Sequence, residues 1–333
     1  MGAETTLMKI VIPGGTGQLG HVLARAFRAR GDEVVVLGRG SGTAAPEGSR
    51  FVPWDGRSVG PAEGGPRERW VDELDGADVV VNLAGRSVDC RYTRANVEAM
   101  MSSRVQSTRA VGQAIARAAR PPRVWLQMST ATIYAHRFDA ANDESTGHLG
   151  GDERDAPSAW KASIDIARAW EQEQVDAPTP STRKVALRTS MVMSPDPGGV
   201  FDVLLRLVRL GLGGPIAGGR QFISWIHERD FARAVGHLVD ADHLAGPVNL
   251  TSPNPLPQRD FMRDLRAAWG APVGLPAAKW MVTLGAFFLR TETELVLKSR
   301  RVVPTRLLDG GFSFEYPEWT AAARDLVARR RGR

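Results

Sequence analysis

The sequence predicts an α/β protein built on a doubly wound parallel sheet, followed by a smaller, mostly helical lobe. Three observations carry this prediction. Short apolar stretches typical of buried parallel strands alternate with helical patterns up to residue 192, a glycine-rich turn joins the first strand to the first helix, and helical patterns dominate after residue 192. Such sheets bind their ligands outside the carboxyl ends of the strands.

Composition argues against several classes of protein. Of the 333 residues, 43% are hydrophobic and 24% are charged, which argues against disorder and against a membrane protein. The most apolar run, residues 280–289, is far shorter than the ~20 residues of a membrane-spanning helix. The first residues lack the pattern of a secretory signal, and Cys90 is the only cysteine, which excludes an internal disulfide. We therefore expect a cytoplasmic protein.

The net charge of +6 raises the question of a nucleic-acid partner. The arginines are scattered along helices and interleaved with acids, which is typical of a solvated surface, and only residues 329–331 form a run. We expect no nucleic-acid and no membrane partner. A small anionic substrate or a phosphorylated cofactor explains the modest basicity more simply.

Residues 10–20 join a short apolar strand to a helix through glycines spaced G-x-x-G-x-x-G. Gly14 permits a tight turn, Gly17 lets the backbone approach a pyrophosphate, and Gly20 lets the helix pack closely on its strand. The helix N-terminus adds N–H groups that favour an anion. The alternative is a glycine-rich turn without a ligand, but the strand before it and the helical spacing after it favour a Rossmann-type dinucleotide cradle. The predicted cofactor contacts here are Gly14, Gly15, Thr16, Gly17, Gln18, Leu19 and Gly20.

A second buried strand, residues 33–37, finishes at Gly38 and Arg39. Dinucleotide-binding folds that prefer NAD place a carboxylate at this position, whereas an arginine suits the 2′-phosphate of NADP. No acid stands beside Arg39, so the strand end favours NADP(H), although a plain surface arginine is the alternative.

Later strands bring further candidates to the same edge of the sheet. Asp55 ends the third strand near the adenine side, small residues follow the fourth strand, and the polar stretch 129–134 follows the fifth. These strands are expected at residues 51–55, 78–85 and 123–128, with a long helix at about 93–119.

The remaining chain divides into a loop, the end of the sheet and the smaller lobe. The first domain is expected at residues 8–192 and the lobe at 193–328, with flexible termini at 1–7 and 329–333. After a polar loop at 139–157, we expect helices at 160–174, 200–210, 229–240, 259–269, 277–289 and 320–329, and strands at 184–189, 222–227 and 248–250.

The order of motifs resembles the extended short-chain dehydrogenase/reductases, and more narrowly their atypical, epimerase-like branch, in which an NAD-dependent epimerase/dehydratase-type domain precedes a C-terminal domain of unknown function. The resemblance covers nearly the whole chain, and the Gly-Gly-Pro and Trp-Ile-His segments are specific to the branch. Besides the glycine loop it rests on residues 38–39, 54–55, 82–85, 103–104, 170–171, 188–192, 211–215, 219–227, 246–251, 301–304 and 307–312.

The resemblance implies an NADP(H)-binding fold with a C-terminal substrate lobe. It assigns Arg39 to the 2′-phosphate and Arg104 to a further polar contact, and it places Leu83, Ala84 and Gly85 beside the cofactor; a packing role for Leu83 and Ala84 is the alternative. By the same analogy, the chain would form a homodimer through the long helices that flank the fourth and fifth strands.

The sequence lacks the Tyr-x-x-x-Lys dyad with which typical members exchange a proton while hydride moves. Four residues after Tyr92, Tyr134 and Tyr316 stand an asparagine, a phenylalanine and a threonine. The helix at 160–174, where the dyad is expected, contains no tyrosine. Ordinary reductase chemistry is therefore in doubt.

Several residues are candidates to replace the dyad. Ser129 and Thr130 occupy the position of the family's substrate-polarising hydroxyl; strand-end hydroxyls bonded only to the backbone are the alternative. Tyr134 could donate a proton if a cation such as Lys161 lay beside it. His227 has a suitable pKa range, but a lone histidine at a strand end is more often structural. The spacing of histidines and carboxylates predicts no metal site.

The sequence thus favours an NADP(H)-dependent oxidoreductase or epimerase-like enzyme that acts on a small polar or anionic substrate. The competing hypothesis is a regulatory protein or sensor that kept its affinity for NADP(H) and lost turnover, as the missing dyad would suggest.

Overall fold

Seven parallel strands form the central layer of the protein. A computed structural model describes residues 7–40, 45–60, 68–153, 157–278, 280–281 and 293–332. The strand order is β10-β6-β5-β4-β1-β2-β3, as in the doubly wound sheet that the sequence predicts. The strands are β1 (Lys9–Pro13), β2 (Glu33–Gly38), β3 (Arg50–Pro53), β4 (Val79–Asn82), β5 (Val124–Thr130), β6 (Arg183–Thr189) and β10 (Gly246–Leu250).

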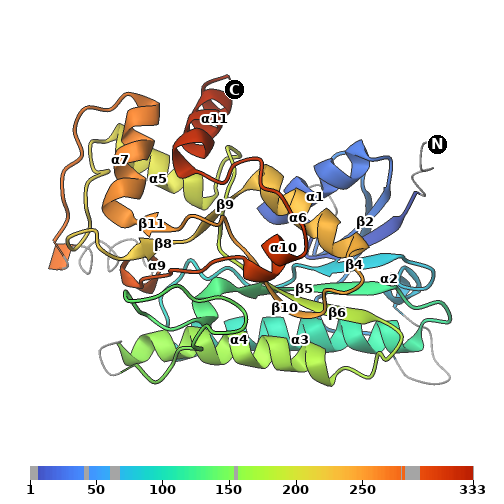
Figure 1. The fold of residues 1–333 in the computed structure, drawn as a ribbon. Helices are drawn as coiled ribbons and strands as arrows, with labels where there is room; N and C mark the ends of the chain where they lie inside the picture. The colour runs from blue at the N-terminus through green and yellow to red at the C-terminus, as the bar shows by residue number, and fades with distance from the viewer. Residues whose placement is uncertain are drawn as a thin grey trace.

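Helices cover both faces of this sheet, which explains why its strands are apolar on both sides. Figure 1 shows α1 (Gln18–Ala29) and α6 (Glu228–Asp240) on one face, and α3 (Arg94–Arg117) and α4 (Ser158–Asp176) along the other. Alternate residues of β1 point to opposite faces: Ile10 and Ile12 pack with the helices α1 and α6, while Val11 packs in the cluster that includes α3. The short helix α2 (Arg69–Asp72) packs near β3.

One strand lies elsewhere than expected. The sequence places residues 248–250 in the smaller lobe, but β10 is the edge strand of the large sheet and pairs in parallel with β6, where Val248 lies opposite Leu187. The helix before it, α6, packs against α1 on the same sheet. Segments beyond residue 192 therefore complete the large sheet and its helical cover. Without β10, the backbone groups along the edge of β6 would lack partners.

A second core holds the C-terminal helices together. Trp225 and Trp319 meet edge to face, with ring centres 5.0 Å apart, and Phe261 stacks on Trp319 at 3.9 Å. The predicted strand at 222–227 is divided into β8 and β9, which belong to two small sheets. The elements of this region are β7 (Met191–Met193), α5 (Val200–Arg209), β8 (Phe222–Ile223), β9 (Trp225–His227), β11 (Leu256–Pro257), α7 (Gln258–Trp269), α9 (Glu294–Leu297), α10 (Thr305–Asp309) and α11 (Trp319–Arg331).

The helix near the C-terminus extends further than the sequence predicts. We expected the chain to be flexible from residue 329, but α11 continues to Arg331, because Arg329 pairs with Glu228 and Asp325 and Arg330 pairs with Asp202. Residues 1–6, and most of the helix expected at 277–289, lie outside the described residues. None of the helices in the described part of the chain is long and apolar enough to cross a membrane.

Candidate cofactor and active site

A pocket of about 540 Å³ opens where the strand order reverses, at the carboxyl ends of β1, β2 and β4. This is the position at which doubly wound sheets bind nucleotides. We call it the cofactor cleft. Its lining residues are Gly14, Thr16, Gly17, Gly38, Arg39, Trp54, Asp55, Gly56, Arg57, Leu83, Ala84, Gly85, Arg86, Ala99, Ser102, Ser103, Gln106 and Ser107.

The glycine loop has the geometry of a phosphate cradle. Gly14 has a φ of +77°, and a Cβ there would lie 2.7 Å from the backbone of Ala84. A Cβ on Gly20 would lie 2.1 Å from the carbonyl oxygen of Gly15, so only glycine allows α1 to begin so close to β1. Gly17, in contrast, is the exposed N-cap of α1, and a Cβ there would meet only the carbonyl oxygen of Gly14, at 3.7 Å. The N–H groups of this helix start can therefore approach an anion closely, and the cleft fits a dinucleotide pyrophosphate.

Other loop residues hold the cradle in place. The methyl group of Thr16 lies against Gly38 at the end of β2, and Gly15 is buried against Ile12. Gln18 reaches the loop before α5, where its Nε2 donates to the carbonyl oxygen of Asp196 over 3.4 Å. Leu19 packs against the core between sheet and helices.

Arginines line the cleft: Arg39, Arg57 and Arg86. Arg39 is exposed and, among the residues that the structure describes, has no hydrogen bond or ion pair. Arg57 lies beside Asp55, whose carboxylate accepts the backbone N–H groups of residues 57 and 58, and these bonds lower the pKa of Asp55 against the effect of burial. Arg86 lines the cleft from the β4 side and donates to Asn96. Sequence reasoning missed Arg57 and Arg86 because neither stands at a strand end.

The loop after β4 is shaped by a buried amide. Asn82 is fully buried, donates to Oε1 of Gln127 and accepts the backbone N–H of Ala84. Leu83 and Ala84 thereby face the cleft opposite Gly14. Gly85 is exposed and lies over the side chain of Arg104.

Arg104 does not line the cleft itself but lies against Gly85, which does. Only 8% of the residue is exposed, and its guanidinium lies 4.8 Å from the ring centre of Trp170. Burial lowers the pKa of Arg104 to about 10, and the nearby Tyr92 and Cys90 counteract this effect. The predicted polar contact of Arg104 with the cofactor stays a prediction.

Ser129 and Tyr134 belong to one buried network of hydrogen bonds. Ser129 donates to Oε1 of Glu171 over 2.5 Å, and Glu171 forms a bidentate ion pair with Arg188. Arg188 in turn donates to the hydroxyl of Tyr134, which donates to Oδ1 of Asn249. These side chains come from β5, β6, β10, α4 and the turn after β5, so the network ties the sheet edge to α4.

The surroundings of Tyr134 and of Thr130 differ. Tyr134 is only 2% exposed, and burial raises its pKa while Arg188 opposes this. The cation beside Tyr134 is therefore Arg188 and not Lys161, which is exposed and pairs with Asp165. Thr130 is partly exposed at the end of β5, and its Oγ1 accepts the N–H of Thr132.

His227 has a structural place at the start of α6. Its Nδ1 accepts the backbone N–H of Arg229 and its Nε2 lies 3.0 Å from Oδ2 of Asp325, while Tyr316 stacks on the ring. Burial lowers the pKa of His227, and Asp325 opposes this shift. Both ring nitrogens are thus engaged within the C-terminal part of the protein.

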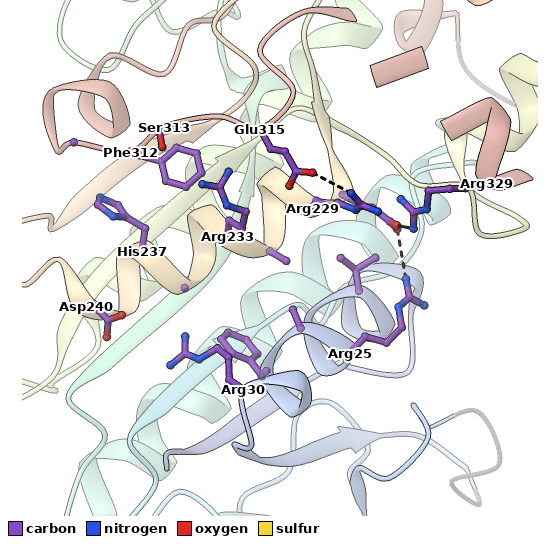
Figure 2. A pocket seen from close by; sticks show the side chains of 17 residues that line it. Arg25, Arg30, Arg229, Arg233, His237, Asp240, Phe312, Ser313, Glu315 and Arg329 are labelled. Atoms are coloured by element: carbon purple, nitrogen blue, oxygen red, sulfur yellow. Dashed lines mark hydrogen bonds and ion pairs between the residues drawn. The ribbon is translucent and has the colours of Figure 1, made fainter. Parts of the chain in front are cut away.

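A second pocket, of about 740 Å³, lies between α1 and α6. Figure 2 shows arginines from α1, α6 and α11 around it. Their guanidinium groups pair with carboxylates: Arg25 and Arg329 with Glu228, and Arg229 with Glu315. Helix sides rather than strand ends line this pocket, so it is not the site at which the fold holds a dinucleotide.

The doubly wound sheet and the cradle at its switch point define the class of Rossmann-type dinucleotide-binding proteins. Comparison with known families narrows this class: residues 10–250 match the NAD dependent epimerase/dehydratase family, and the chain belongs to this family. Residues 277–326 match a domain of unknown function, DUF1731. The predicted combination of an epimerase-like domain and a C-terminal domain of unknown function is confirmed.

Related proteins are similar over their whole length. The epimerase family protein SDR39U1 of Bos taurus is 32% identical over 96% of this chain and 100% of its own, and YfhF of Bacillus subtilis is 27% identical over 97% and 99%. The crystal structure of human SDR39U1 (isoform 2) with NADPH superposes with a TM-score of 0.80 at 29% identity, covering 96% of this chain and 99% of the other. UDP-N-acetylglucosamine 4-epimerase of Bacillus cereus shares the fold, with a TM-score of 0.72 at 16% identity over 98% of this chain and 97% of the other.

Proposed function

We propose that the protein binds NADP(H) in the cofactor cleft and works as an oxidoreductase or epimerase-like enzyme on a small polar or anionic substrate. The observation that carries this proposal is Arg39, an exposed arginine without a described partner at the end of β2, beside the glycine cradle. Arg57 and Arg86 add positive charge to the same cleft, and Asp55 is engaged by its own turn. The human relative crystallised with NADPH supports the same cofactor.

The nicotinamide, when bound, supplies or accepts a hydride, and the chain itself must position the cofactor and manage a proton. The residues that would hold the cofactor are those of the glycine loop, Arg39 and the loop 83–85. The hydroxyls of Ser129, Thr130 and Tyr134 stay candidates for the contact with the substrate oxygen. Thr130 is the one among them that is not buried.

Replacing Arg39 tests the cofactor assignment. We expect the purified protein to bind NADPH more tightly than NADH, and Arg39→Ala to weaken NADPH binding about tenfold or more while NADH binding stays unchanged, because a charge-assisted hydrogen bond contributes about 1.5–3 kcal/mol. Fluorescence or calorimetric titration at fixed salt measures both affinities. Arg324→Ala, an exposed arginine on α11, is the matched control. Equal affinities for the two nucleotides before mutation would refute the assignment.

The competing function is an NADP(H) sensor without turnover. The observation that favours it is the buried network, which engages the hydroxyls of both Ser129 and Tyr134. Following NADPH oxidation against ketones, aldehydes and sugar nucleotides separates the two functions. If the protein oxidises NADPH with one of these compounds and Ser129→Ala abolishes this turnover, the result supports an enzyme with Ser129 at the substrate. Tight NADPH binding without turnover of any compound supports the sensor.

A further inference from the structure

A second polar cluster, separate from the Ser129 network, joins α4 to the segment before α3 and to α9. Ser163 on α4 has its Oγ 3.1 Å from the hydroxyl of Tyr92 and 2.5 Å from Oε2 of Glu294. Tyr92 precedes α3 and Glu294 begins α9, so three distant segments meet at this point. Two cations, Lys298 and Arg300, follow Glu294 in the chain.

Neighbours of the cluster reach both a residue of the cofactor cleft and the turn after β5. On one side, Tyr92 interacts electrostatically with Arg104, whose side chain supports Gly85 in the cleft. On the other side, Lys298 donates to the carbonyl oxygen of Thr132 over 2.8 Å, and Arg300 donates to its hydroxyl over 3.1 Å. Thr132 stands two residues after the strand end, where the substrate of a doubly wound sheet is expected.

Glu294 is a buried carboxylate that requires compensation. Its side chain is 1% exposed and lies 3.4 Å from the ammonium group of Lys298, which is equally buried. Arg300 adds a second positive charge and donates to the backbone carbonyl of Glu294. A buried charge is tolerated when it is paired and hydrogen-bonded, and Lys298 and Arg300 supply these partners to Glu294.

The charge of Glu294 sets the direction of the hydrogen bonds. A carboxylate only accepts, and the hydroxyl of Ser163 has a single proton. Ser163 therefore donates to Glu294 and accepts from Tyr92. The phenol of Tyr92 is held with its proton directed into a chain that ends on a carboxylate.

Among the three tyrosines, the surroundings single out Tyr92. Tyr134 is buried, with its hydroxyl bound to Arg188 and Asn249, and Tyr316 stacks on His227 next to α11. Tyr92 is partly exposed and lies against α4, the helix on which the absent dyad would stand. Its phenol reaches that helix from a different segment of the chain.

We propose that Tyr92, Ser163 and Glu294 form a proton relay that takes the place of the Tyr-x-x-x-Lys dyad; this proposal rests on the NADP(H)-dependent function above. Tyr92 is the catalytic residue at the substrate oxygen, and Ser163 and Glu294 are positioning residues that act through it.

The relay conserves protons in both directions. When an alcohol is oxidised and its hydride leaves to the nicotinamide, the hydroxyl proton passes to the oxygen of Tyr92. The Tyr92 proton passes to Ser163, and the Ser163 proton passes to Glu294, which becomes a neutral carboxyl group. Reduction of a carbonyl runs the same transfers backwards and leaves Glu294 ionised.

The first test uses NMR of the nucleotide-free protein labelled with ¹³Cζ-tyrosine, so it does not depend on activity. The chain has three tyrosines, and Tyr92→Phe identifies the Tyr92 signal. We expect Ser163→Ala and Glu294→Gln each to move this signal and to leave the signals of Tyr134 and Tyr316 in place. Ser163→Thr, which keeps a hydroxyl, should leave the Tyr92 signal near its original position. An unchanged Tyr92 signal in Ser163→Ala overturns the relay.

The second test measures turnover with the panel of carbonyl compounds and sugar nucleotides, at saturating nucleotide. We expect Tyr92→Phe to lower kcat about 10²- to 10⁴-fold, the range of general acid–base catalysis, with the affinity for NADPH unchanged. Ser163→Ala and Glu294→Gln should lower kcat and turn a curved proton inventory in mixed H₂O and D₂O into a linear one. Ser163→Thr should retain most of the turnover.

The controls separate the relay from the cofactor assignment. Tyr316→Phe removes a partly exposed phenol elsewhere and should leave kcat unchanged. Ser163→Ala removes no charge, so it tests the relay even if Glu294→Gln, which leaves Lys298 without its partner, fails to fold. If the protein binds NADPH and turns over a substrate, and Tyr92→Phe does not reduce this turnover, the relay is overturned but the cofactor function is not. Absence of NADPH binding overturns the cofactor function, whatever the NMR signals do.

Discussion

At the scale of single residues, glycines fix the shape of the cofactor cleft. Gly14 combines a left-handed backbone with a close approach to Ala84, and Gly20 allows α1 to meet the turn at Gly15. These two constraints are independent of each other: one concerns the φ angle and the other the space for a side chain. Few other residues near the cleft depend so strictly on their type.

Gly14→Ala should therefore destabilise the protein more than an ordinary glycine replacement. An L-residue in the left-handed region costs about 1–2 kcal/mol, and the clash with Ala84 adds to this. Gly270→Ala is the matched control, since Gly270 has a φ of +82° with nothing within 4 Å of the added Cβ. Urea unfolding measures both losses of free energy. Equal losses would contradict the role of the Ala84 contact.

At the scale of elements, capping and ion pairing join α6 to α11. His227 caps the N-terminus of α6 with Nδ1 and contacts Asp325 on α11 through Nε2. Glu228, the first residue of α6, binds Arg329 of α11. Two consecutive residues at the junction of β9 and α6 thus link α6 to α11.

This arrangement predicts how stability depends on pH. Because burial lowers the pKa of His227, the unfolded chain, whose histidines titrate near about 6.5, binds a proton before the folded protein does as pH falls. Stability should be retained above pH ~6.5 and decrease below it, by no more than about 1.4 kcal/mol per pH unit. Asp325 has a lowered pKa and adds its own loss at still lower pH.

Replacement by asparagine isolates the contribution of His227. His227→Asn keeps a residue that caps helices well but does not titrate, so its free energy of unfolding should fall less steeply between pH 7.5 and 5.5. Urea unfolding across this range measures both slopes. Identical slopes in the two proteins would show that His227 does not carry the dependence.

At the scale of the whole molecule, the chain crosses between its two parts more than once. The large sheet is completed by β10 and covered by α6, both of which come after residue 192. The first 192 residues alone would expose the edge of β6 and the apolar face of α1, including Val22 and Phe27. The large sheet therefore depends on segments that follow residue 192.

A fragment of residues 1–192 should for this reason fail to fold on its own. We expect it to lack the cooperative thermal transition of the full-length chain and to be cleaved rapidly by protease, because unpaired edges and exposed apolar faces are not stable in water. Circular dichroism and limited proteolysis, with the full chain as control, measure this. A fragment that melts cooperatively would support an independent first domain.

Much of the fold follows from local sequence. Alternating apolar stretches predict six of the strands of the large sheet in their places, and the glycine spacing with Arg39 predicts the position of the cofactor cleft. Arg57 and Arg86 were missed because loop side chains carry no periodic pattern. The prediction that places β10 in the smaller lobe was wrong, because neither the length nor the composition of this strand indicates which sheet it joins.

What the sequence by itself determined is the class of fold, the family, the position of the glycine loop and the absence of the dyad, since each follows from short motifs and their order along the chain. Only the tertiary structure decided which side chains meet: Ser129 with Glu171 and Arg188, and Tyr92 with Ser163 and Glu294. Such contacts join segments far apart in sequence, and the packing of α4 against the sheet brings them together. Local spacing contains no information about that packing.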